Sequence, residues 1–220
     1  MENRASLFSS LVVFAAVLLG ATASQAAGFT VHSYELGEQI RLTNGTRVWT
    51  AQLDVSIENV ASHVPSFCVD VYTHIGVGQY DTRNILDADT GAAPAGERAR
   101  NFAWAGHVME TYGADIASLA TGNITRAQAI TGVQAAIWQG IYGGNMINRY
   151  SLSAGARTIF DEIMRTAFTG TTDANIAEFI GVQDQVFNGP RPTNPIPEPS
   201  AALVFGVGTL VAGSVLRRRA

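Results

Sequence analysis

Residues 125–142, TRAQAITGVQAAIWQGIY, decide the fold class, because they form the longest of three stretches with apolar residues at helical spacing. Thr125 is a suitable N-cap residue, and Gly143 and Gly144 mark the expected end of this helix. Similar spacing predicts two further helices, one over residues 98–112 and one over residues 154–167. The second half of the chain is therefore expected to be mainly helical.

Short strands are predicted on both sides of this helical region. Before it, strand-like composition covers residues 29–31, 39–42, 47–57 and 67–72, and after it residues 176–187. Asn44-Gly45 is a hairpin turn signal, and a Gly- and Asp-rich loop is expected over residues 76–96. This order predicts an α+β fold, mainly an antiparallel β-sandwich or barrel-like sheet with a segregated helical subdomain.

Composition limits the classes of protein to which the chain can belong. Its 220 residues are 47% hydrophobic and 15% charged, which suits one globular domain. Taking Glu2, Arg4 and Arg217–Arg219 from the 18 acidic and 14 basic residues leaves 17 and 10, a net charge of −7 for the body. A body this acidic repels phosphate backbones, so no nucleic-acid partner is expected.

The N-terminus has the layout of a secretory signal peptide over residues 1–26. Arg4 precedes an apolar run from Leu7 to Leu19, and Ser24 and Ala26 are the small residues before an expected cut at Ala27. A retained anchor helix is the alternative, but the run is shorter than a membrane-spanning helix requires. The sequence therefore predicts that the protein is exported.

The C-terminus combines three parts in a fixed order. Pro197-Glu198-Pro199 follows a Pro-rich linker over residues 189–196, residues 200–216 are uncharged and long enough for a transmembrane helix, and Arg217, Arg218 and Arg219 end the chain. The segment 197–220 resembles the PEP-CTERM sorting signal of Gram-negative bacteria. That resemblance implies cleavage by an exosortase, after a transient inner-membrane stage, and release to the cell surface or extracellular matrix. A permanent single-pass anchor is the alternative.

Two residues in the body stand out chemically, Cys68 and Gln134. A single cysteine in an exported protein is a buried thiol, an intermolecular bridge or a reactive group. Helical spacing places Gln134 inside the apolar stripe of its helix, with Gln128, Thr131, Ala135 and Gln139 on the opposite face. A buried carboxamide needs partners for its donors and acceptors, and strand backbone is one ordinary partner.

Two segments of the body resemble the paired signature of the thioester domains of bacterial surface adhesins. They are Phe67-Cys68-Val69-Asp70 and Val133-Gln134-Ala135-Ala136-Ile137-Trp138, in which Gln134 lies 66 positions after the cysteine. The resemblance covers residues 30–187, within a body of residues 27–188. It implies an internal thioester between Cys68 and Gln134 that acylates an amine on a partner and gives covalent adhesion. We expect Asp70, Ile137 and Trp138 to form the surrounding shell. Val133 departs from the threonine that many family members have.

Two other functions remain open. One is a structural matrix or biofilm protein of the same fold without thioester reactivity. The other is a cysteine hydrolase that pairs Cys68 and Asp70 with His74 or His107. The thioester adhesin and the structural protein are both expected not to be enzymes. No cofactor or metal is expected, because the histidines lack metal-ligand spacing. The three tryptophans are expected in the core, although Trp49 could instead shield the thioester.

Overall fold

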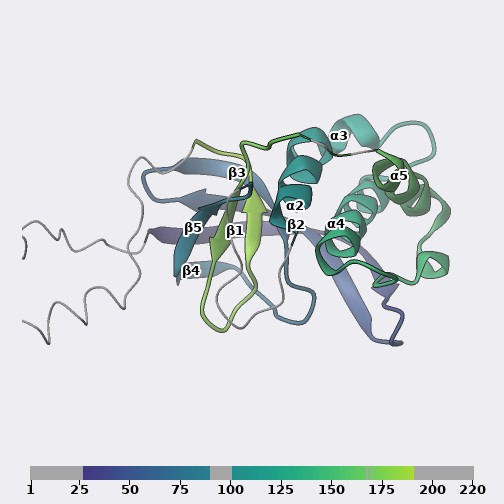
Figure 1. The fold of residues 1–220 in the computed structure, drawn as a ribbon, viewed down its shortest axis with the longest axis horizontal. Coiled ribbons are helices and arrows are strands. Elements are labelled where there is room, and N and C mark those ends of the chain that lie inside the picture. The colour runs from purple at the N-terminus through teal and green to yellow at the C-terminus, as the bar shows by residue number, and fades with distance from the viewer. Residues whose placement is uncertain (1–26, 90–100, 167, 169, 191–220) are drawn as a thin grey trace, which may run out of the picture. The chain divides into compact units, whose positions relative to one another are not determined.

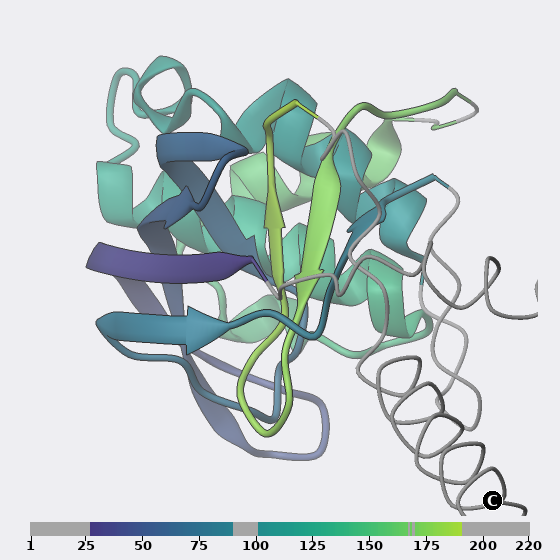
Figure 2. The same ribbon diagram turned by 90° about the vertical axis from the view of Figure 1, so that its left-hand side faces the viewer.

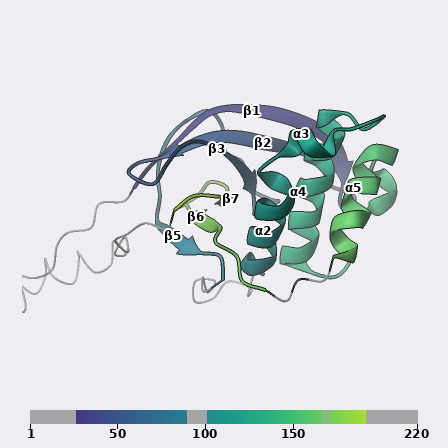
Figure 3. The same cartoon turned by 90° about the horizontal axis from the view of Figure 1, so that it is seen from above.

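The computed structural model describes residues 27–89, 101–166, 168 and 170–190 (Figure 1). Seven strands form one antiparallel sheet in the order β4-β1-β2-β3-β7-β6-β5. The sheet curls into a half-barrel over the described residues (Figure 3). The strands are β1 Gly28–Arg41, β2 Arg47–Ile57, β3 Ala61–Cys68, β4 Gly78–Asp81, β5 Asn84–Asp87, β6 Asn175–Glu178 and β7 Gln185–Phe187.

The helices gather on one side of the sheet (Figure 1). They are α2 Phe102–Val108, the π-helical turn η1 Met109–Gly113, α3 Ile116–Leu119, α4 Arg126–Tyr142, the 3-10 turn η2 Arg149–Ser151 and α5 Ala154–Arg165. Strands before the helices and strands after them pair within one sheet, because β3 pairs with β7 and β5 with β6 (Figure 2). The predicted α+β class with a segregated helical part is confirmed.

The hairpin between β1 and β2 turns where the sequence predicts it. Gly45 has a φ of +88°, Gly45 N–H donates to the Leu42 carbonyl at 3.0 Å, and the Asn44 carboxamide accepts from Thr46 N–H at 2.9 Å. Only glycine adopts this φ without strain. Leu42 then bridges to Ile147, so the hairpin end is tied to the segment between α4 and α5.

Helix α4 lies at the centre of the helical part. It begins with a capping box in which Thr125 and Gln128 satisfy each other's backbone N–H groups. Every residue from Ala129 to Trp138 is buried, so the expectation of one exposed face is wrong for this stretch. Thr131, which was expected on the polar face, accepts from Glu38 N–H at 2.7 Å and lies 2.9 Å from the Thr50 hydroxyl. Helices and sheet thus cover the middle of α4 on all sides.

Glycines allow the neighbouring helices to approach α4 closely. A Cβ on Gly140 would lie 1.9 Å from the Trp104 ring of α2, and one on Gly132 would lie 2.6 Å from Ile159 of α5. The Trp104 indole N–H donates to the Ala136 carbonyl at 2.9 Å, which joins α2 to α4. These contacts fix the position of α4, which carries Gln134.

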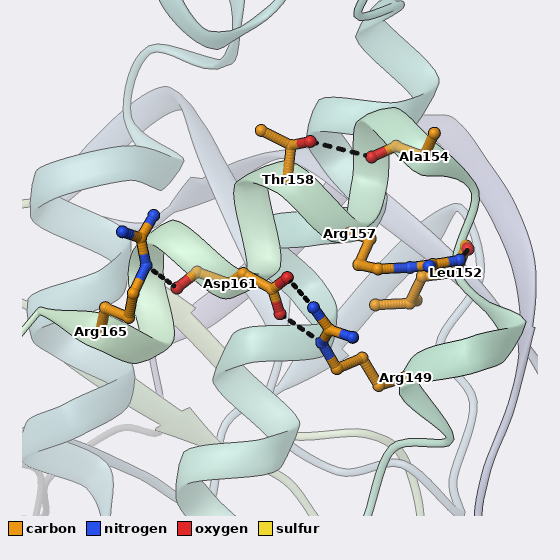
Figure 4. A network of polar contacts seen from close by, with 7 residues as sticks. All are labelled: Arg149, Leu152, Ala154, Arg157, Thr158, Asp161 and Arg165. Carbon is orange, nitrogen blue, oxygen red and sulfur yellow. Dashed lines mark hydrogen bonds and ion pairs between the residues drawn. The ribbon is translucent and has the colours of Figure 1, made fainter.

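A polar network around Asp161 joins α5 to η2, the turn before it (Figure 4). Arg149 binds Asp161 through both oxygens, with Nε at 2.6 Å from Oδ1, and Arg165 Nε donates to the Asp161 carbonyl at 3.1 Å. The hydrogen bonds from Arg149 hold the pKa of Asp161 below its ordinary value. The network lies on the surface, where such pairs contribute little stability.

Several predicted boundaries shift. The helices over 126–142 and 154–165 agree with expectation, while the third is a short α2 that continues as a π-helical turn. The predicted strand at 67–72 ends at Cys68, the strand at 176–187 is two strands, and the loop at 76–96 contains β4 and β5. These two strands are only four residues long, too short for a clear alternation of apolar residues.

The predicted terminal segments lie outside the described residues. These are the signal peptide 1–26, the motif Pro197-Glu198-Pro199, the span 200–216 and the terminal arginines, together with most of the linker 189–196. Within the described ranges, none of the helices has the length and apolar character needed to cross a membrane.

Candidate functional site

Cys68 and Gln134, 66 positions apart, are brought into direct contact. Cys68 is the last residue of β3, and Gln134 lies in the middle of α4. Cys68 N–H donates to Gln134 Oε1 at 3.1 Å, and Gln134 Nε2 donates to the Cys68 carbonyl at 2.7 Å. The Gln134 carboxamide is therefore docked against the main chain of Cys68 itself.

Both residues are removed from water. Gln134 is 0% exposed and Cys68 is 6% exposed. The strand-backbone pairing expected for an ordinary buried glutamine does occur, and the backbone it uses is that of the cysteine. The thiol is free in this structure, and its residue is the cysteine that the sequence singles out.

The sulfur of Cys68 has its own hydrogen-bond donor. Gln185 of β7 is paired with Cys68 across the sheet, and its Nε2 lies 3.4 Å from Sγ. Burial raises the pKa of the Cys68 thiol to about 12, Gln185 acts against this rise, and the Asp70 carboxylate adds to it. The resting group is therefore a neutral thiol.

Asp70 is buried beside this site and holds neighbouring segments together. Its carboxylate accepts from the Tyr142 hydroxyl at 3.2 Å and from Asp184 N–H at 3.3 Å. Gln183 donates to the Asp70 carbonyl. The structure thus places Asp70 two residues from the cysteine, where it joins the end of α4 to the segment before β7.

A cavity of about 520 Å³ reaches the site from the surface. Buried Cys68 and Trp138 line it, and so do the exposed side chains of Tyr34, Leu36 and Trp49. Trp49 is 58% exposed, so its predicted core position is wrong, while Trp104 and Trp138 are buried as expected. Ile137 is fully buried on α4 but is not among the lining residues.

A larger hollow of about 890 Å³ lies elsewhere, along Gly28–Thr30, Ser56–Ser62 and Gln79–Asp81. It contains neither Cys68 nor Gln134. No group of three or more potential metal ligands occurs among the described residues.

The histidines do not form a nucleophile pair with Cys68. His74 lines the cavity with the cysteine, but no hydrogen bond joins the two within the described ranges. His107 instead stacks on Phe168, with ring centroids 4.6 Å apart. In this structure, neither His74 nor His107 is hydrogen-bonded to Cys68.

The sequence did not reveal Gln185, nor Ser66, whose hydroxyl donates to Gln185 Oε1 at 2.9 Å. Both lie in or beside predicted strands, and a polar residue in a strand carries no signal that it faces a sulfur atom. Only the register of β3 against β7 brings Gln185 opposite Cys68.

No protein-family model matches the sequence, and no curated protein matches it. One solved structure with a similar chain path is the N-terminal thioester domain of fibronectin-binding protein SfbI from Streptococcus pyogenes. The identity is 12%, the match covers 74% of this chain and 98% of that chain, and the TM-score is 0.42. A likeness of this size assigns no role to Cys68 or Gln134, whose roles must come from their contacts.

Proposed function

We propose that Cys68 and Gln134 form an internal thioester, and that the protein uses this bond to attach covalently to an amine-bearing partner. The pair of hydrogen bonds between the Gln134 carboxamide and the Cys68 main chain is the observation that carries this proposal. The paired Cys and Gln-x-Ala-Ile-Trp signature, which resembles bacterial thioester domains, supports it independently.

In the first step, Cys68 Sγ attacks Gln134 Cδ. A C–S bond forms, the C–N bond breaks, and the thiol proton leaves with the amide nitrogen as ammonia. Negative charge grows on Oε1 during this attack, and Cys68 N–H already donates to that oxygen at 3.1 Å. Holding the two groups together in a buried site supplies the proximity that the reaction requires.

In the second step, a neutral amine of the partner attacks the same carbon. A C–N bond forms, the C–S bond breaks, and the proton lost by the amine ends on Sγ. The products are an amide at position 134 and a free Cys68 thiol. The cavity that Cys68 shares with Trp49 and Trp138 is the route by which an amine would approach.

The composition of the chain suits a reactive acyl group. The sequence contains no lysine, so no lysyl amine of this chain can consume the thioester. Arginine stays protonated and is a poor nucleophile. A partner that offers lysine or another primary amine is therefore the expected target, although a general preference for arginine would leave the same composition.

The setting of this chemistry follows from the predicted termini. Export through residues 1–26, transient anchoring by the 200–216 span and exosortase cleavage near Pro197-Glu198-Pro199 would release the domain to the cell surface or the matrix. We propose a single covalent attachment in that place. The protein would not turn over as an enzyme does.

A structural matrix protein is the second candidate, and a specific observation favours it. Both polar atoms of the Gln134 carboxamide are already hydrogen-bonded, as in an ordinary buried amide. The raised pKa of Cys68 also makes the thiolate scarce at neutral pH. Such a protein would have the same fold and no thioester.

Intact mass spectrometry separates the two candidates. We expect the purified protein to be lighter than its sequence by one ammonia, and methylamine to add to this species and give a product heavier than the sequence by one CH2 group. Cys68→Ala and Gln134→Glu should show the full mass and no adduct. A wild-type protein of full mass with a titratable Cys68 thiol would sink the thioester proposal and leave the structural role.

A further inference from the structure

Gln185 makes a contact with the sulfur that the thioester chemistry described above leaves unused. In the antiparallel pairing of β3 with β7, Gln185 lies directly opposite Cys68, so their side chains share one face. Gln185 is fully buried, and its Nε2 lies 3.4 Å from Sγ. It comes from a different element than Gln134 and touches a different atom of the cysteine.

The orientation of the Gln185 carboxamide is fixed by two further contacts. Its Nε2 donates to the Gln183 carbonyl at 3.3 Å, and its Oε1 accepts from the Ser66 hydroxyl at 2.9 Å. A carbonyl oxygen only accepts, so the amide nitrogen must lie on the Gln183 side. That orientation directs an N–H group at the sulfur.

Both steps of the proposed reaction place negative charge on this sulfur. The sulfur attacks Gln134 as a thiolate, and it leaves as a thiolate when an amine displaces it. Asp70 is two residues away and repels such a charge. Among the described residues, the donor that meets Sγ is Gln185.

The geometry points to Gln185 as the hydrogen-bond donor that stabilises the Cys68 thiolate, both when it attacks Gln134 and when it is displaced by the partner's amine. This inference rests on the proposed thioester. In aminolysis the electron pair of the breaking C–S bond passes to Sγ. The Gln185 N–H donates a hydrogen bond to this thiolate until the proton from the amine is transferred to it. Gln134 thus supplies the acyl group, and Gln185 stabilises the thiolate leaving group.

The test compares Gln185→Met with a matched control. Methionine keeps the length and volume of the side chain and removes the donor. Gln52→Met is the control, because Gln52 is also a buried strand glutamine, but its carboxamide bonds to the Gly113 carbonyl and to Arg126. In full-length protein, we expect Gln185→Met to slow methylamine aminolysis about tenfold to hundredfold, and Gln52→Met to change it by less than about twofold.

A second readout does not require the thioester. In a Gln134→Met background the Cys68 thiol is free, and its alkylation by iodoacetamide reports the thiolate. Adding Gln185→Met should slow alkylation at a fixed pH about tenfold and move the pH–rate profile to higher pH. If wild-type protein lacks the ammonia loss, the proposed function fails while this readout still measures the donor.

Several outcomes would overturn the inference. One is unchanged aminolysis in folded Gln185→Met, and another is unchanged or faster alkylation in the double variant. A third is ammonia loss that persists in Gln134→Glu and disappears in Gln185→Met, since Gln185 would then be the acyl donor itself. If Gln185→Met does not fold, Ser66→Ala replaces it, because this variant removes the hydroxyl that holds the Gln185 carboxamide. Ser66→Ala should also slow aminolysis, by a smaller factor. An unchanged rate would count against the inference.

Discussion

The Gln134 carboxamide closes a ring of two hydrogen bonds on the main chain of Cys68, at 3.1 Å for Oε1 and 2.7 Å for Nε2. A backbone N–H only donates and a carbonyl only accepts, so the oxygen and nitrogen of this amide cannot be exchanged. The oxygen that would carry negative charge in a thioester reaction therefore already faces a donor. The same ring makes Gln134 important for stability before any reaction, since thioester formation would remove Nε2 and its bond to the Cys68 carbonyl.

Replacing Gln134 tests the ring directly. Gln134→Met leaves the buried N–H and carbonyl of Cys68 without partners, whereas a neutral carboxylic acid in Gln134→Glu can donate to one and accept from the other. At about pH 5 we expect Gln134→Glu to be more stable than Gln134→Met by about 1–3 kcal/mol. Chemical denaturation followed by circular dichroism measures the difference.

The difference should shrink as the pH rises. Burial favours the neutral acid, so the carboxyl pKa in the folded state exceeds that in the unfolded state. The stability it contributes is then complete at low pH and lost as the pH rises through the folded pKa. Equal stability of the two variants at pH 5 would show that the ring contributes nothing.

The pKa of Cys68 gives a second expectation. Burial raises it from an ordinary 9.0 to about 12, so in Gln134→Met the alkylation rate should increase about tenfold per pH unit from about pH 7 to pH 11. An ordinary thiol would level off near pH 9. Stopped-flow or mass-spectrometric alkylation kinetics distinguish the two profiles.

Stability should follow the same titration. The pKa of Cys68 is higher in the folded state than in the unfolded state. The stability that the neutral Cys68 thiol contributes to Gln134→Met is therefore complete below about pH 9 and declines as the pH rises toward 12. The double variant Gln134→Met/Cys68→Ala has no thiol and should lack this decline. Parallel stability curves for Gln134→Met and the double variant between pH 8 and 11 would contradict the raised pKa of Cys68.

Sequence reasoning located the central pair and, with Asp70 and Trp138, part of its surroundings. The odd cysteine and the helical spacing singled out Cys68 and Gln134, the resemblance to bacterial thioester domains paired them, and Thr125 was expected as the cap at which the helix begins. The expected polar face of α4 was wrong in the middle of the helix, because Thr131 is buried against Thr50, which lies 81 positions away in a strand. Long-range pairings of this kind, including Gln185 opposite Cys68, depend on sheet register, which short strands do not specify.

Gly140 tests how tightly α4 must pack to present Gln134. A Cβ at this position would lie 1.9 Å from Trp104 Cδ1, so Gly140→Ala requires the ring or the helix to shift. We expect a loss of about 1–3 kcal/mol in the free energy of unfolding and slower thioester formation. Gly170→Ala is the control, since its Cβ would meet only a Phe168 ring carbon at 3.9 Å. Equal stability of the two variants would show that the contact tolerates a methyl group.

Trp49 tests whether the cavity is the route to the thioester. Its indole is 58% exposed and lines the same cavity as Cys68, so truncation should widen the approach for small nucleophiles. We expect Trp49→Ala to accelerate both hydrolysis and methylamine aminolysis about threefold to tenfold, because less apolar surface then shields the thioester from water and amines. Tyr150→Ala removes an aromatic ring that is 84% exposed and does not line this cavity, and it should leave both rates unchanged. Time-resolved intact mass measures the two reactions separately, and rates that stay equal in all three proteins would place the route elsewhere.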